Sequence, residues 1–193
     1  GFDADSLGAL APTALKGLAP AAIESIKPEA FAGIDESQLK AFAVTQMKKF
    51  QAEQLANITP EAIKAMLPVQ IKALVPSAVA GLIETQVSVL PIATFKSFSV
   101  TQLKSLTVDA VSGITSKQLD VMTSKQFAAF DLKQLPAIEP AAIAKVDLDQ
   151  LKVLSAPQLK SFTDEQVADI PTKVIKLLPP SKKAAILVSL NNL

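Results

Sequence analysis

An eight-residue unit repeats 23 times along this chain, from Asp3 to Ile186, without a break in register. Its consensus is T-P-E-Q-L-K-A-L. Position eight is apolar in every unit, and position five is apolar in every unit except the last, which has Lys183. The resulting three-five spacing fits neither the two-residue period of a strand nor the three-four alternation of a coiled coil. The backbone must therefore change direction once in every unit.

The other positions of the unit indicate where a helix begins. Position one is often Thr, Ser or Asp, whose side-chain oxygen caps a helix N-terminus, and position two is Pro in eight units, which suits the first helical residue. Gln at position four, present in twelve units, completes a capping box. The predicted caps are Asp35, Thr59, Ser99, Thr107, Thr115, Thr123, Asp131, Asp147, Ser155 and Thr163, and the prolines are Pro12, Pro20, Pro28, Pro60, Pro68, Pro76, Pro140 and Pro180.

Each unit thus has room for one helix of about six residues, which is too short to persist alone in water. Stacking on neighbouring units must hold it, with positions five and eight inward and position six outward. We therefore predict an all-α fold, a solenoid or superhelix of very short helices, with three or four octads per turn. Small residues at positions four and seven predict close helix contacts in four units: Ala14/Gly17, Ala30/Gly33, Ala78/Gly81 and Ala110/Gly113.

We expect residues 1–193 to form a single repeat domain, with octads over residues 3–186. The octad is lost after Ile186, so residues 187–193 are expected to form a C-terminal cap or end, and the last helix could continue into them. Phe2 occupies the eighth position of an incomplete unit, so we expect the chain to begin inside a longer array.

Composition disfavours several functions. The chain has no Cys and no His, and therefore lacks a thiol nucleophile, the commonest general base and the commonest metal ligand. The six glycines are isolated and form no phosphate loop or dinucleotide fingerprint. We therefore expect a protein that is not an enzyme, with no catalytic residue, no cofactor, no metal site and no small-molecule substrate.

The charges also limit the possible partners. All 19 basic residues are Lys, they are scattered along the chain, and 18 acidic residues balance them. A nucleic-acid-binding protein usually has a concentrated positive face and Arg, so we expect no nucleic-acid binding. Polar residues interrupt every apolar stretch, so no transmembrane segment is predicted either.

Four groups of polar residues have both a functional and a structural interpretation. The acidic groups Asp35-Glu36, Asp147/Asp149 and Asp164-Glu165 could act as acids, bases or metal ligands, but their place at helix starts favours capping. Position-six lysines eight residues apart, such as Lys40/Lys48 and Lys96/Lys104, could form basic ridges, but we favour a solvated face. The glutamines could form a ladder inside the stack or complete caps, and we favour caps. Ser99, Thr107, Thr115 and Thr123 could align on one edge to bind ice or a glycan, but capping explains them too.

One modification site is predicted. Asn57-Ile58-Thr59 is an N-glycosylation sequon, and Asn57 is its acceptor, although Pro60 directly after it disfavours its use.

The unit resembles TPEQL-type short repeats of long microbial surface or secreted proteins, a resemblance that implies no functional residues. We expect a structural module, a rod-like or curved spacer or scaffold in a larger extracellular, cell-surface or filamentous assembly, with protein partners or self-assembly. The alternative is an intracellular α-solenoid scaffold that binds a peptide or protein. An extracellular or surface location is favoured.

Overall fold

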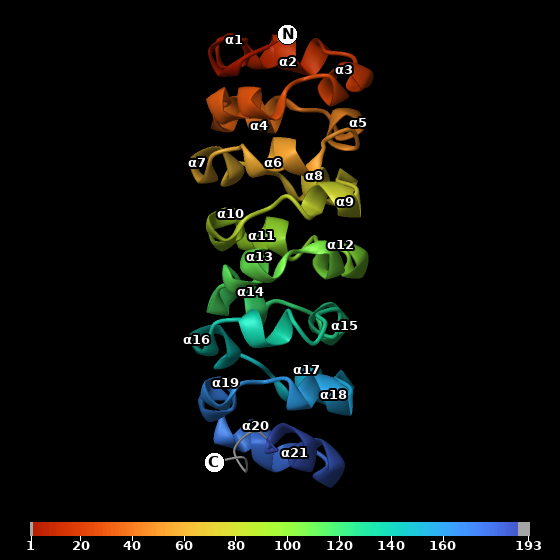
Figure 1. Cartoon of the computed structure of the whole chain (residues 1–193), viewed down its shortest axis with the longest axis vertical. Coiled ribbons are helices and arrows are strands. Elements are labelled where there is room, and N and C mark those ends of the chain that lie inside the picture. Colours follow the sequence, from red (N-terminus) through yellow and green to blue (C-terminus); the bar gives the residue numbers. More distant parts are fainter. Residues whose placement is uncertain (1, 189–193) are drawn as a thin grey trace.

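The computed structural model describes residues 2–188, and all regular structure within this range is helical (Figure 1). Twenty-one α-helices and two 3-10 helices follow one another, each in a different octad of the sequence. Their bounds are α1 Ala4–Gly8, α2 Pro12–Gly17, α3 Pro20–Glu24, η1 Pro28–Gly33, α4 Glu36–Ala41, α5 Val44–Met47, α6 Ala52–Ala56, α7 Pro60–Ile63, α8 Pro68–Ala73, α9 Pro76–Val79, α10 Glu84–Val89, α11 Ile92–Phe95, α12 Val100–Ser105, α13 Val108–Ser112, α14 Ser116–Asp120, α15 Ser124–Phe127, η2 Leu135–Ala137, α16 Pro140–Ile143, α17 Leu148–Val153, α18 Ala156–Lys160, α19 Asp164–Asp169, α20 Thr172–Leu177 and α21 Pro180–Ile186.

The helix starts follow the predicted capping chemistry. All ten predicted position-one caps accept a hydrogen bond from the backbone N–H three residues later, although at Asp131 this closes a turn before η2 rather than an α-helix. All eight position-two prolines lie at the first residue of a helix. The predicted helix starts are therefore confirmed.

The helices stack along one long axis, from α1 at one end to α21 at the other (Figure 1). The main packing contacts join helices that are three octads apart, such as α1 with η1, α10 with α13, and α18 with α21. Each helix is thus held by the turns before and after it. The all-α class is confirmed, and this arrangement is compatible with a helical repeat solenoid.

The core runs the length of the stack as one cluster of apolar side chains from positions five and eight. Between Ile23 and Ile170, every residue at these two positions is buried. The largest aromatic contact is formed by Phe31, Phe42 and Phe50, whose ring centroids lie 5.1–6.4 Å apart. The last helix ends at Ile186, and residues 187 and 188 form a turn. Residues 189–193 lie outside the described range.

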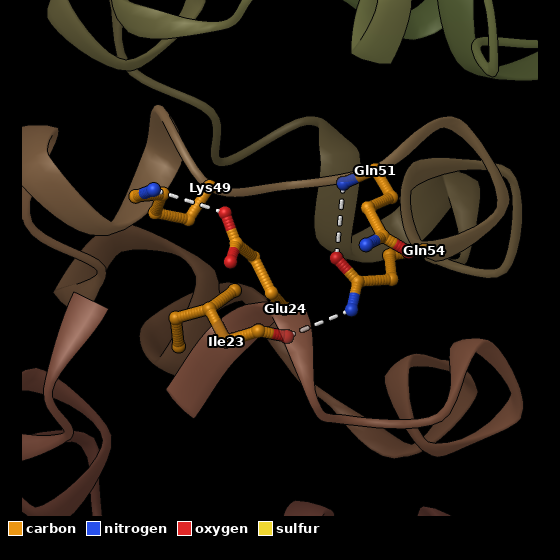
Figure 2. Close-up of polar contacts among 5 residues, drawn as sticks. All are labelled: Ile23, Glu24, Lys49, Gln51 and Gln54. Carbon is orange, nitrogen blue, oxygen red and sulfur yellow. Dashed lines mark hydrogen bonds and ion pairs between the residues drawn. The ribbon is translucent and has the colours of Figure 1, made fainter. Parts of the chain in front are cut away.

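Each of the twelve position-four glutamines caps two helices at once. Its Oε1 accepts the backbone N–H of position one in its own octad, at 2.7–3.1 Å. Its Nε2 donates to the position-eight carbonyl of the octad four units earlier, at 2.5–3.1 Å. We call this double contact the Gln clamp. Figure 2 shows Gln54, whose Oε1 accepts the N–H of Gln51 and whose Nε2 also donates to the position-five carbonyl of Ile23, 31 residues earlier.

The Gln clamp explains how these helices end. The last carbonyls of a helix have no partner within it, and a glycine in the left-handed conformation usually helps to satisfy them. No residue of this kind occurs in the described range. Glutamine amides from the next turn serve instead, and no buried side-chain N or O atom in this range lacks a partner. The cap interpretation of the glutamines is therefore confirmed, and their amides bond to the backbone of an earlier turn rather than to one another.

The stack has between three and four octads per turn, because helices pack three octads apart while glutamines bond four octads back. The predicted close contacts are confirmed at three of the four Ala/Gly units. A Cβ added to Gly33, Gly81 or Gly113 would lie only 1.9–2.2 Å from a carbonyl oxygen three octads earlier. A Cβ added to Gly17 would have nothing within 4 Å.

Candidate interaction surfaces

The acidic residues singled out in the sequence lie at helix starts. Asp35 and Asp147 each accept the N–H of a glutamine three residues later, at 2.8 and 2.7 Å. The pKa of Asp35 is lowered, first by the Gln38 N–H and then by the Ser37 hydroxyl, which stabilise the charged form. The pKa of Glu165 is also lowered, by its own N–H and then the Thr163 hydroxyl. A lowered pKa suits a cap rather than a general acid.

The hydroxyl-bearing caps do not form one edge. Ser99 and Thr123 precede α12 and α15, which pack three octads apart, but Thr107 and Thr115 begin helices of other stacks. All four side-chain oxygens accept backbone N–H groups. The suggested flat array of these four residues is therefore wrong, because successive octads lie at different positions around the axis.

Asn57 lies at the C-terminus of α6, where its Nδ2 donates to the Glu53 carbonyl at 2.9 Å. Ile58 is buried, and Thr59 caps α7. A glycan on Asn57 would change the group that makes this bond. Glycosylation of Asn57 stays a prediction.

Residues 2–188 form neither a cluster of metal ligands nor a membrane-spanning helix. No three or more Asp or Glu side chains in this range come together as a metal site. Within the same range, every helix is too short or too polar to cross a bilayer.

The position-six lysines form rows along the stack. Lys16, Lys40 and Lys64 lie on α2, α4 and α7, which pack in that order, and all three are exposed. A second row follows α5, α8 and α11; its lysines are Lys48, Lys72 and Lys96. The predicted ridges joined lysines eight residues apart, but the packed helices are 24 residues apart. The rows of exposed lysines therefore join residues 24 positions apart rather than eight.

The helices at the two edges of the stack come from different octads. Figure 1 shows α1, α7, α10, α16 and α19 along one edge, which we call the acidic edge. The opposite edge, which we call the basic edge, is formed by α3, α5, α9, α12, α15 and α18.

Charge differs between the two edges. The five octads of the acidic edge contain eight acidic residues and two lysines, giving a net charge of −6. The six octads of the basic edge contain one acidic residue and five lysines, giving +4. The near-neutral chain therefore has two edges of opposite charge.

Three surface hollows are lined in part by acidic side chains. The first lies between α10, α13 and α16, and is lined by Glu84, Ser88, Ser112, Ile114, Glu139 and Ala142, among others. The second hollow lies four octads earlier in the chain, between α6, α9 and α13, and its lining includes Glu53, Leu82 and Asp109. The third is lined by Phe2, Asp3, Lys27, Glu29 and Ala30.

The hollows occur in units that lack the Gln clamp. Ala142 and Ala30 occupy position four at the first and third hollows, and Ala110 belongs to the octad that lines the second. Each hollow also contains the position-eight residue 28 positions earlier, which is Ile114, Phe2 or Leu82. At these places the carbonyl that a glutamine would bind has no donor from position four.

Most surface charges have no ion-pair partner within the molecule. The single ion pair in residues 2–188 joins Lys49 Nζ to Glu24 Oε1 at 3.0 Å, and both side chains are partly exposed (Figure 2). The charges that line the hollows and the lysines of the two rows are therefore available to a partner.

No protein-family model matches the chain, and no curated protein matches it in sequence.

Proposed function

We propose that this protein is a non-catalytic structural module, an α-solenoid of tandem octads that acts as a rod-like spacer or scaffold within a larger extracellular, cell-surface or filamentous assembly. The Gln clamp is the observation that carries the proposal. It bonds each turn to the next by a contact that is local along the axis, so octads can be added without rearranging a central core.

The residues of the unit support this role. Positions one, two and four begin the helix, positions five and eight form the core, and the glutamine amide closes the previous turn. Nearly every distinctive residue type in the unit thus has a structural task. The length of a rod built in this way depends on the number of octads.

An in-register deletion tests the proposal. Removing residues 67–146, ten whole octads, would place Gln150 opposite the carbonyls of Leu39 and Phe42, which Gln70 now binds. We expect a folded protein with unchanged helicity per residue and a maximum dimension shorter by roughly two-fifths in small-angle scattering.

The matched control removes residues 67–142 and disrupts the eight-residue register. We expect that variant to lose helicity and to melt at a lower temperature. Equal behaviour of the two deletions, or an intact protein as compact as a globular chain of this length, would overturn the proposal.

The hollows support the alternative function, a scaffold that binds a peptide or protein on its side. Two of them occur at similar places in octads that lie four units apart. Isolation of one stoichiometric soluble partner, lost when Ser88 and Ser112 are both changed to Lys, would favour this alternative over the spacer.

A further inference from the structure

The first hollow contains the two backbone groups that a Gln clamp would join. In the octad of residues 139–146, position four is Ala142, so the N–H of Glu139 and the carbonyl of Ile114 lack the glutamine that binds their counterparts elsewhere. Within residues 2–188, neither group has another hydrogen-bond partner. Both residues line the hollow together with Ala142. The first hollow is therefore a Gln clamp without its glutamine.

The second hollow is the equivalent site four octads earlier. Eight of the nine residues that line it have a counterpart 32 residues later in the lining of the first hollow. Position four is here Ala110, and in the described part of the chain the N–H of Thr107 and the carbonyl of Leu82 also have no hydrogen-bond partner. The octad of α13 lines both hollows, so the two sites are neighbours.

The other octads show which chemical group suits such a pair. Twelve octads use a carboxamide, whose Oε1 accepts the N–H and whose Nε2 donates to the carbonyl. Three octads have proline at position one and hence no N–H there: Pro91, Pro171 and Pro179. None of these three has glutamine at position four; Thr94 and Lys182 instead donate to the position-eight carbonyl 28 residues earlier. A carboxamide is thus used only where the N–H is present.

Both backbone groups are present in each hollow, and a primary carboxamide pairs with both of them. An ammonium group only donates, so it would leave the N–H of Glu139 unpaired. A carboxylate only accepts, so it would leave the carbonyl of Ile114 unpaired, and it would lie near the carboxylates of Glu84 and Glu139. A backbone amide is trans, so its N–H and C=O point in opposite directions.

We propose that each of the two hollows binds a primary carboxamide, the side chain of a glutamine from a partner polypeptide. Its oxygen accepts the N–H of Glu139 or Thr107, and its NH2 group donates to the carbonyl of Ile114 or Leu82. A polypeptide with several glutamines gains affinity by occupying both sites at once. The inference rests on the scaffold role proposed above and names the group that the scaffold holds.

Nuclear magnetic resonance of the isotope-labelled protein tests this through the backbone N–H signals of Glu139 and Thr107. The probe is the tripeptide Gly-Gln-Gly, closed by an acetyl group and a methylamide so that its only primary amide is the glutamine side chain. Both signals should shift, with a dissociation constant on the order of millimolar, because two hydrogen bonds replace bonds to water. The tripeptides with Glu or Lys in place of Gln should bind roughly tenfold more weakly, since each leaves one backbone group unpaired.

Variants at one hollow use the other hollow as the matched control. Ala142→Gln completes the clamp of the first hollow, and Ala142→Leu fills it without either hydrogen bond. In both variants the tripeptide should no longer shift the Glu139 signal but should still shift that of Thr107. A peptide with about ten consecutive glutamines should bind the wild type roughly tenfold more tightly than it binds Ala142→Gln, because only the wild type offers both hollows.

Absence of a shift at both N–H groups with roughly 0.1 M tripeptide would overturn the inference. So would equal binding of the Glu or Lys tripeptide, or a Glu139 shift that persists in both variants. Equal affinity of the longer peptide for the wild type and Ala142→Gln would overturn a polypeptide that joins the two sites. In all these cases a rod-like monomer by small-angle scattering would leave the spacer proposal standing, whereas a compact particle would remove that proposal as well.

Discussion

The side-chain amide of Gln150 donates to the carbonyl of Met122, 28 residues earlier, at 2.9 Å, and the same nitrogen lies 3.1 Å from the carbonyl of Leu119. Its Oε1 accepts the N–H of Asp147 at 3.0 Å. One buried side chain thus closes the C-terminus of α14 and the N-terminus of α17. Because twelve glutamines make this connection, we regard the amide of position four as the main polar link between turns.

Removing that link should lower the free energy of unfolding. Gln150→Ala leaves the Leu119 and Met122 carbonyls and the Asp147 N–H without their side-chain partner in a buried place. We expect a loss of about 1–3 kcal/mol in the free energy of unfolding, measured by urea denaturation. Lys152→Ala, on the exposed face of the same helix, is the control and should change it by less than about 0.5 kcal/mol. Similar losses in the two variants would contradict a special role for the amide.

The reverse change should stabilise the protein. Ala142 occupies position four of its octad, and glutamine there would reach Ile114 and the N–H of Glu139 as the other twelve do. We expect Ala142→Gln to raise the free energy of unfolding by about 0.5–1.5 kcal/mol. Ala142→Leu fills the same hollow without donating a hydrogen bond, so its free energy of unfolding should stay below that of the glutamine variant. A leucine variant at least as stable would show that filling the hollow, not the amide, is responsible.

Local rules were enough to predict where the helices begin and which residues form the core. Thr115 caps a helix through its own side chain, and Pro140 begins one because its missing N–H is not needed there. Leu119 is apolar at position five and fully buried. These properties depend on residues within one octad, so the sequence contains all that is needed.

Relations between turns could not be predicted in the same way. Whether Gln118 reaches Val87 and Leu90 depends on the number of octads per turn, which no single octad specifies. The same number decides that Lys40 follows Lys16 rather than Lys48 along a row. The charge difference between the two edges could therefore not be predicted from a sequence whose charges are scattered.

Asp35 provides a test of the capping interpretation by pH. Its pKa lies below the ordinary value of 3.8, because the Gln38 N–H and the Ser37 hydroxyl stabilise the carboxylate. A lowered pKa in the folded state stabilises the protein above the unfolded value, and this contribution is lost as pH falls through the folded value. Asp35→Asn keeps the cap without the charge. The free energy of unfolding of the wild type should therefore fall more steeply below about pH 4 than that of the variant. Parallel acid unfolding curves would show that Asp35 does not contribute in this way.

Glycine at position seven should matter only where another turn lies against it. A Cβ on Gly113 would lie 2.2 Å from the carbonyl oxygen of Glu84, which belongs to the backbone and cannot easily move. Gly113→Ala should therefore separate α13 from α10 and lower the free energy of unfolding by about 1–3 kcal/mol, as overpacking does. Gly17→Ala is the matched change at the same position of its octad, with nothing within 4 Å. Because alanine favours a helix more than glycine, that variant should gain up to about 1 kcal/mol. Chemical denaturation should therefore give changes of opposite sign in the free energy of unfolding of the two variants. An equal decrease in both would mean that contacts between helices three octads apart do not explain glycine at position seven.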